Sequence, residues 1–147
     1  MVTSKTPVIH RPNTTYKTKM KFETIGPWNC INLMQKGNTA ANPTQTASYF
    51  VAFKSDRIEL QRYPKDASWT DGIVQKFDNN KTVVKDNTWF DVEYSVDYTT
   101  EGIHIVFYID GEKYFDYIDT SNLNCVFDNI GYMANNANGT MSVANSN

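Results

Sequence analysis

The chain has 147 residues and a formal net charge of -2, and 14% of its residues are aromatic. This length suits one domain, which would bury roughly 68–70% of the surface that its unfolded chain exposes. The lack of a basic excess argues against nucleic acid as a partner. No stretch approaches the roughly 20 apolar residues that cross a bilayer, so we expect no membrane association either.

The first 13 residues lack the apolar stretch of a signal peptide, and we expect a linker or an edge strand there. From residue 14 onward, almost every segment alternates with a period of two, which is typical of half-buried strands. The expected strands cover residues 16–24, 30–36, 48–54, 56–63, 72–77, 89–98, 102–110, 113–119, 129–135 and 139–145. No segment has helical periodicity. The pattern predicts one all-β domain over residues 14–147, an antiparallel two-sheet β-sandwich or jelly roll.

Residues 93–119 predict two hairpins with a defined register. A four-residue loop at 99–102 gives a core-facing row of three pairs: Tyr98 with Ile103, Val96 with Ile105 and Tyr94 with Phe107. The outer row opposes Asp97 to His104, and we expect these two side chains to interact. The second hairpin turns at 110–112. A three-residue loop with a bulge pairs Phe107 with Phe115, whereas a two-residue turn would place Asp116 on the core side.

The segment "DNTWFDVEYSVDYTTEGIHIVFYIDGEKYFDYID" resembles the second half of concanavalin A-like lectin/glucanase sandwiches, also called laminin G-like domains. The shared pattern comprises Trp89, Val92, Gly102 and the turn at 110–111. Residues 15–36, 48–63 and 139–147 resemble the first and final strands of the same family, so the resemblance covers roughly residues 14–145. It implies a concanavalin A-like fold in which Trp89 packs into the core.

The same resemblance implies a function. Such domains are often carbohydrate-binding modules of secreted bacterial polysaccharide lyases and glycoside hydrolases. We therefore expect a polysaccharide or oligosaccharide ligand, an extracellular location, and further domains of a larger enzyme as partners. The balance of basic and acidic residues does not decide between a neutral and an acidic polysaccharide.

Catalysis is not expected. The glucanase branch of the family carries Glu-x-Asp-x-x-Glu or Glu-x-Asp-x-Glu on one strand, and this chain has neither motif. Asp91, Glu93 and Asp97 share a strand face that we expect to be a solvated surface. Two alternatives stay open: a glycoside hydrolase or lyase that uses Glu59, Glu93 or Asp97, and a structural or adhesion domain without a sugar site.

Sugar binding needs aromatic rings that stack on pyranose C–H groups and a few polar groups that bond the hydroxyls. Alternation places Asn32, Glu59, Gln61 and Tyr63 on the outer face of the expected concave sheet, and Arg62 at a strand end could reach either side. Two tryptophans lie in the expected loops "IGPWN" and "DASWTDG", although the first could instead cover a sheet edge. The predicted ligand-binding residues are Trp69, Trp28, Gln61, Tyr63, Arg62, Asn32 and Glu59.

Metal binding and disulfide pairing stay open. Sandwich modules of the family often hold a structural calcium ion, but no segment has an EF-hand pattern, so no metal ligand is assigned. The loop carboxylates that could bind calcium are Asp66, Asp71, Asp110, Asp119 and Asp128. Cys30 and Cys125 are too few for a disulfide framework. We expect two separately buried thiols, with a single pairing as the alternative.

Overall fold

The computed structural model describes residues 2–3, 14–26, 28–35, 48–63, 73–78, 84–120, 129–135 and 141–145. Within these ranges, the backbone alone is described for residues 2–3, 28, 34–35, 48, 63, 73–78, 129–135 and 141–145. Over the described part of the chain, no helix has the length and apolar character needed to cross a bilayer.

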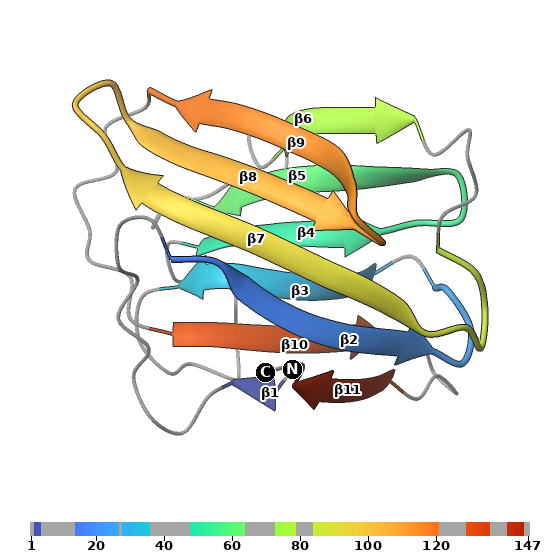
Figure 1. Cartoon of the computed structure of the whole chain (residues 1–147). Coiled ribbons are helices and arrows are strands. Elements are labelled where there is room, and N and C mark those ends of the chain that lie inside the picture. Colours follow the sequence, from blue (N-terminus) through green and yellow to red (C-terminus); the bar gives the residue numbers. More distant parts are fainter. Residues whose placement is uncertain are drawn as a thin grey trace.

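The described ranges form strands in two antiparallel sheets. The strands are β1 (Val2–Thr3), β2 (Tyr16–Phe22), β3 (Trp28–Gln35), β4 (Ser48–Phe53), β5 (Arg57–Tyr63), β6 (Ile73–Asp78), β7 (Phe90–Tyr98), β8 (Ile103–Ile109), β9 (Glu112–Asp119), β10 (Asn129–Asn135) and β11 (Met141–Asn145). The six-stranded sheet has the order β1-β10-β3-β4-β5-β6, and the five-stranded sheet has the order β11-β2-β7-β8-β9. Figure 1 shows the five-stranded sheet lying across the front of the six-stranded sheet. The predicted antiparallel two-sheet sandwich is confirmed.

The expected strands from residue 16 onward are all present, with shifted bounds. One shift concerns a predicted ligand residue: Trp28 is the first residue of β3, where the sequence indicated a loop. The first strand, β1, pairs with β10 at the edge of the six-stranded sheet.

The core lies between the sheets and is held together by aromatic rings. Phe53 of β4 is fully buried, and its ring contacts three phenylalanines of the five-stranded sheet. The centroid distances are 5.5 Å to Phe22, 5.2 Å to Phe90 and 6.4 Å to Phe107. Such tilted pairs add about 0.5–1.5 kcal/mol each beyond the burial of their area. Phe53 therefore anchors one sheet on the other.

The first predicted hairpin has the expected register. Every predicted pair of β7 and β8 is present, from Tyr98 opposite Ile103 to Tyr94 opposite Phe107. Buried residues alternate with partly exposed ones along β8, and the buried residues include those of the predicted core-facing row. Tyr98 departs from the prediction, because it is 47% exposed at the end of its strand.

The second hairpin confirms the predicted pairs but not the predicted loop. Phe107 lies opposite Phe115 as expected, yet the turn has only two residues, Asp110 and Gly111, both at positive φ (49° and 80°). Positive φ at both central positions is the geometry that tight hairpins favour. The extra residue is Tyr114, which sits in a bulge where the register shifts between Phe107 and the next residue. The bulge thus lies inside β9, and it keeps the core row in place.

Candidate functional site

The outer face of the six-stranded sheet gathers three of the predicted ligand-binding residues. In β5, Ile58 and Leu60 belong to the core, so Glu59 and Gln61 lie on the opposite face. Asn32 of β3 lies in the same row as Gln61, because both residues pair with one residue of β4. Asn32, Glu59 and Gln61 are buried, with relative exposures of 2%, 0% and 2%. Their position on the outer face therefore does not make them accessible.

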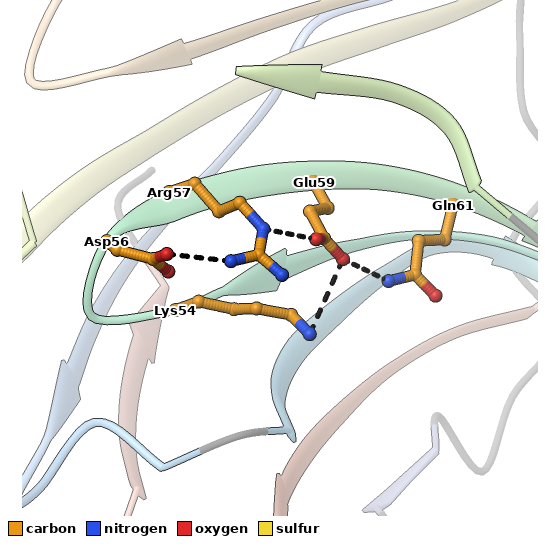
Figure 2. A network of polar contacts seen from close by, with 5 residues as sticks. All are labelled: Lys54, Asp56, Arg57, Glu59 and Gln61. Atoms are coloured by element: carbon orange, nitrogen blue, oxygen red, sulfur yellow. Dashed lines mark hydrogen bonds and ion pairs between the residues drawn. The ribbon is translucent and has the colours of Figure 1, made fainter. Parts of the chain in front are cut away.

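Glu59 is the centre of a polar network, shown in Figure 2. Its Oε1 accepts a hydrogen bond from Nε of Arg57 at 2.5 Å, and its Oε2 accepts one from Nε2 of Gln61 at 2.6 Å. The ammonium group of Lys54 lies 3.5 Å from the same Oε2. Nη1 of Arg57 also donates to Asp56 at 2.7 Å. These five residues form the Glu59 network.

The Glu59 network keeps its central carboxyl group ionised. Burial alone would raise the pKa of Glu59, but hydrogen bonds from Arg57 and Gln61 and the charge of Lys54 outweigh burial and hold the pKa below its ordinary value. The hydrogen bond to Glu59 in turn raises the pKa of Arg57. The carboxylate has 1% side-chain exposure, whereas 32% of the Arg57 side chain is accessible. The network thus presents a fixed cation at the surface.

Arg57 and Lys54 are site residues that the sequence analysis did not assign. Arg57, Glu59 and Gln61 follow one another at a spacing of two in β5, and this spacing places side chains on one strand face. The strand pattern alone could therefore have found Arg57. Lys54 reaches the network from the turn between β4 and β5, where its backbone N–H donates to the carbonyl of Arg57 at 2.9 Å. The contact of the Lys54 ammonium group with Glu59 therefore depends on the conformation of this turn.

Arg62 lies on the inner side of the six-stranded sheet, away from the Glu59 network. It pairs in register with Tyr49, whose side chain belongs to the core. Nη1 of Arg62 lies 2.9 Å and 2.8 Å from the two carboxylate oxygens of Asp119 at the end of β9. The hydroxyl of Tyr49 donates to the same carboxylate. Arg62 therefore joins the two sheets.

The predicted aromatic ligands fall at or beyond the limits of the described residues. Trp69 lies outside them. Trp28 begins β3 and Tyr63 ends β5, and only the backbone of each is described. Their contact with a sugar stays a prediction.

Of the two cysteines, Cys30 is a free, buried thiol of β3, and burial raises its pKa well above its usual range. Cys125 lies outside the described residues. The predicted buried thiol is therefore present at Cys30.

The described residues contain no group of three or more His, Cys, Asp or Glu side chains that could hold a metal ion. Two of the predicted calcium ligands have protein partners: Asp110 accepts a hydrogen bond from the backbone N–H of Asp91 at 2.8 Å, and Asp119 binds Arg62. The other three candidates, Asp66, Asp71 and Asp128, lie outside the described residues. Calcium binding stays a prediction for them.

The carboxylates that the sequence offers for catalysis lie on opposite outer faces of the sandwich. Glu93 and Asp97 alternate with buried residues of β7, so they face outward from the five-stranded sheet, whereas Glu59 faces outward from the other sheet. Packed sheets are about 10 Å apart. The two carboxyl groups of a glycosidase are roughly 5–9.5 Å apart. Glu59 therefore cannot flank one glycosidic bond together with Glu93 or Asp97.

His104 interacts with a different carboxylate from the predicted one. It lies opposite Asp97 in the expected register, but its Nε2 lies 2.7 Å from Oδ1 of Asp116. Lys113 donates to the other oxygen of Asp116 at 2.9 Å, and hydrogen bonds from His104 and Lys113 lower the pKa of Asp116. The expected partner is wrong because Asp116 of β9, opposite Val106, is the diagonal neighbour of His104.

Trp89 is not a core residue, contrary to the expectation from the family position. Its relative exposure is 47%, whereas the following residue, Phe90, is buried at 3%. Strand alternation turns Trp89 outward when Phe90 faces the core. Nζ of Lys21 lies 5.4 Å from the centroid of the Trp89 ring, within the range of a cation–π contact.

No protein-family profile and no curated protein matches this sequence. Several solved structures are similar in fold. Sheep galectin-11 in complex with glycerol has a TM-score of 0.53 at 12% identity, with 97% of this chain and 96% of that chain covered. The carbohydrate-binding module CBM66 from Bacillus subtilis has a TM-score of 0.53 at 13% identity, covering 97% of this chain and 74% of that one.

An enzyme is also among the similar structures. A mutant of the alginate lyase Aly36B, in complex with an alginate trisaccharide, has a TM-score of 0.52 at 12% identity and covers 81% of this chain. This chain spans 58% of the lyase chain. Galectin-11 and CBM66 are concanavalin A-like β-sandwiches, and the present chain has that fold. At these identities the likeness shows the fold alone.

Proposed function

We propose that this chain is a non-catalytic carbohydrate-binding module that binds a polysaccharide at the outer face of its six-stranded sheet. The observation that supports the proposal is the fixed and partly exposed position of Arg57. Its partly exposed guanidinium is held by the buried carboxylate of Glu59, so its position is set before a ligand arrives. Among the described residues, Nη2 of Arg57 makes no hydrogen bond. This nitrogen has two N–H groups to donate to sugar hydroxyls.

The fixed position of Arg57 lowers the cost of binding. Ordering a flexible side chain at an interface costs about 0.5–1.5 kcal/mol, and the Glu59 network has already ordered this one. Glu59 and Gln61 contribute by holding Arg57 in place, because both are buried. In this proposal, Asn32 supports the same face from a buried position, and the rings that stack on the sugar come from Trp69, Trp28 and Tyr63.

We further propose that the chain acts as a module of a secreted, multidomain enzyme. Binding would hold the attached catalytic domain at its polysaccharide, and the raised local concentration would speed the reaction without any bond being broken by the module. The likeness to CBM66 and the strand motifs shared with modules of secreted lyases and hydrolases support this context.

A polysaccharide lyase is the alternative function, and the likeness to Aly36B favours it. A lyase begins its elimination with a general base that removes a proton from the sugar ring, and a carboxylate serves best in this role when its pKa is raised toward the working pH. The pKa of Glu59 is lowered instead, and its carboxylate is already bonded to Arg57 and Gln61. Glu59 is therefore suited to holding a cation rather than to transferring a proton.

Affinity electrophoresis against a panel of neutral and acidic polysaccharides tests the proposal. At least one polysaccharide should retard the native chain. Arg57→Met should weaken that binding by about 10–100-fold, because a hydrogen bond from a charged group contributes about 1.5–3 kcal/mol. The matched control is Lys17→Met on the other sheet, which removes a cation that is also paired with a carboxylate and should leave retardation unchanged.

A second variant separates binding from folding. Arg57→Met leaves the buried Glu59 carboxylate without its main partner, so Arg57→Met/Glu59→Gln removes both charges. The double variant should fold and show the same weakened binding as Arg57→Met. No retardation of the native chain by any polysaccharide would overturn the module. Release of unsaturated sugar from the panel would establish the lyase instead.

A further inference from the structure

A ladder of lysines runs along β2 on the outer face of the five-stranded sheet. Lys17 lies 3.1 Å from Glu93, and Lys19 lies 3.4 Å from Asp91, so the first two lysines are each neutralised by a carboxylate of β7. The third lysine, Lys21, has a different partner. Nζ of Lys21 lies over the ring of Trp89, at 5.4 Å from its centroid.

Lys21 keeps an uncompensated charge. Within the described part of the chain it makes no ion pair, whereas its two neighbours on the same strand face each make one. An indole ring attracts a cation but carries no net charge that could neutralise it. An anion that approaches the Trp89 ring therefore finds a lysine that is free to pair with it.

The turn that carries Trp89 is fixed to the end of β2. The backbone N–H of Asn87 donates to the carbonyl of Phe22 at 2.6 Å, and Asp86 accepts a hydrogen bond from the backbone N–H of Ile25 at 2.8 Å. Asn87 has a positive φ of 51°, which ends the turn just before the indole. Trp89 is thus an exposed ring on a braced turn, and stacking on it requires little further ordering.

We propose that Trp89 and Lys21 form a second saccharide contact that is specific for a uronate residue of an acidic polysaccharide. The pyranose C–H groups stack on the exposed part of the indole, and the sugar carboxylate pairs with Nζ of Lys21. This inference rests on the proposed function, because it requires that the chain binds polysaccharides. It adds the class of sugar, which the overall charge of the sequence does not reveal.

The two contacts lie on opposite outer faces of the sandwich. Trp89 and Lys21 belong to the outer face of the five-stranded sheet, and Arg57 belongs to the outer face of the six-stranded sheet. One module can therefore bind two chains of an acidic polysaccharide at once. In affinity electrophoresis, both contacts then contribute to its retardation by that polysaccharide.

Nuclear magnetic resonance of the indole N–H groups tests the contact directly. The chain has three tryptophans, and Trp89→Phe identifies the signal of Trp89. An alginate trisaccharide should shift this signal, and the neutral cellotriose should not. Lys21→Gln should weaken the affinity for the alginate trisaccharide, read from a titration of this signal, by about tenfold, as expected for the loss of one charged contact. Lys19→Gln should change this affinity by less than about twofold. Salt should weaken it as well.

The outcomes separate this inference from the proposed function. A Trp89 signal that the alginate trisaccharide leaves in place, while a polysaccharide still retards the native chain through Arg57, overturns the uronate contact alone. Equal losses in Lys21→Gln and Lys19→Gln overturn it as well, because they would show a general charge effect. A shift that survives in Arg57→Met supports an independent second contact.

Discussion

Arg62 and Asp119 form an ion pair that joins the two sheets, with Nη1 of the arginine 2.9 Å and 2.8 Å from the two carboxylate oxygens. The side chain of Asp119 is only 4% exposed, and that of Arg62 is 21% exposed. Tyr49 adds a hydroxyl donor to the same carboxylate. The end of β9 is thus attached to β4 and β5 by charge as well as by the apolar core.

Removing one member of this pair should destabilise the fold strongly. Asp119→Asn removes the carboxylate that pairs with the partly buried guanidinium of Arg62. Breaking a fully buried pair costs about 3–5 kcal/mol. We expect about 2–4 kcal/mol here, because Arg62 keeps some contact with water. Urea unfolding followed by tryptophan fluorescence measures the loss.

Two further variants decide whether the buried charge is the cause. Asp116→Asn removes a carboxylate that is 49% exposed and should cost about 0.5 kcal/mol or less. Arg62→Met/Asp119→Leu should recover most of the stability, since apolar replacement of a buried pair is often neutral. Similar losses in Asp119→Asn and Asp116→Asn would contradict the assignment.

The Glu59 network should make stability depend on pH in the acidic range. The pKa of Glu59 is lowered in the folded state from an ordinary value of 4.5, so the unfolded chain takes up this proton first as pH falls. A carboxyl group of this kind stabilises the fold above pH 4.5, and its contribution is lost as pH falls through the lowered folded value. Glu59→Gln should therefore be less stable than the native chain by about 1–3 kcal/mol at pH 7.

The difference between native chain and Glu59→Gln should stay level from pH 7 to about pH 5 and shrink below pH 4.5. Chemical unfolding at a series of pH values measures this profile. A difference that is the same at about pH 3 and pH 7 would show that Glu59 acts through shape and not through charge.

The sequence predicted the strands and the main register because other registers would move apolar rows out of the core and charged residues into it. In β7 and β8, a slip by one residue would have buried Asp97 in place of Val96, so the pairing followed from the pattern. A bulge was predicted for the same reason, since it keeps Asp116 out of the core, but it was expected in a three-residue loop at 110–112 and lies in β9 instead. Its exact place, at Tyr114, depends on the preference for a two-residue turn at positive φ.

The side-chain partners were harder to predict, because they depend on twist and on diagonal neighbours. His104 bonds Asp116 of the adjacent strand rather than Asp97, which lies directly opposite. Arg62 turns inward to a strand that is distant in sequence. Sequence periodicity assigns a face to each residue, but it does not measure how much of that face the rest of the chain covers. Glu59 was expected to be accessible for this reason.

Cys30 should resist chemical modification while the chain is folded. Its thiol is buried, and burial raises its pKa, so very little thiolate forms at neutral pH. Alkylation with iodoacetamide followed by peptide mass spectrometry should find Cys30 unmodified in buffer and modified in strong denaturant. Rapid modification of Cys30 in the native chain would contradict its burial in β3.

The two glycines of the β7–β8–β9 hairpins should respond to alanine very differently. Gly102 has φ of 154°, and a Cβ there would lie 2.1 Å from the carbonyl oxygen of Asp119, so the backbone of β9 would have to move. We expect Gly102→Ala to cost at least about 3 kcal/mol. At Gly111 no atom lies within 4 Å of the added Cβ, so only the strain of positive φ remains, about 1–2 kcal/mol. Thermal unfolding of both variants measures the contrast, and equal losses would show that the close approach of Gly102 to Asp119 does not constrain the fold.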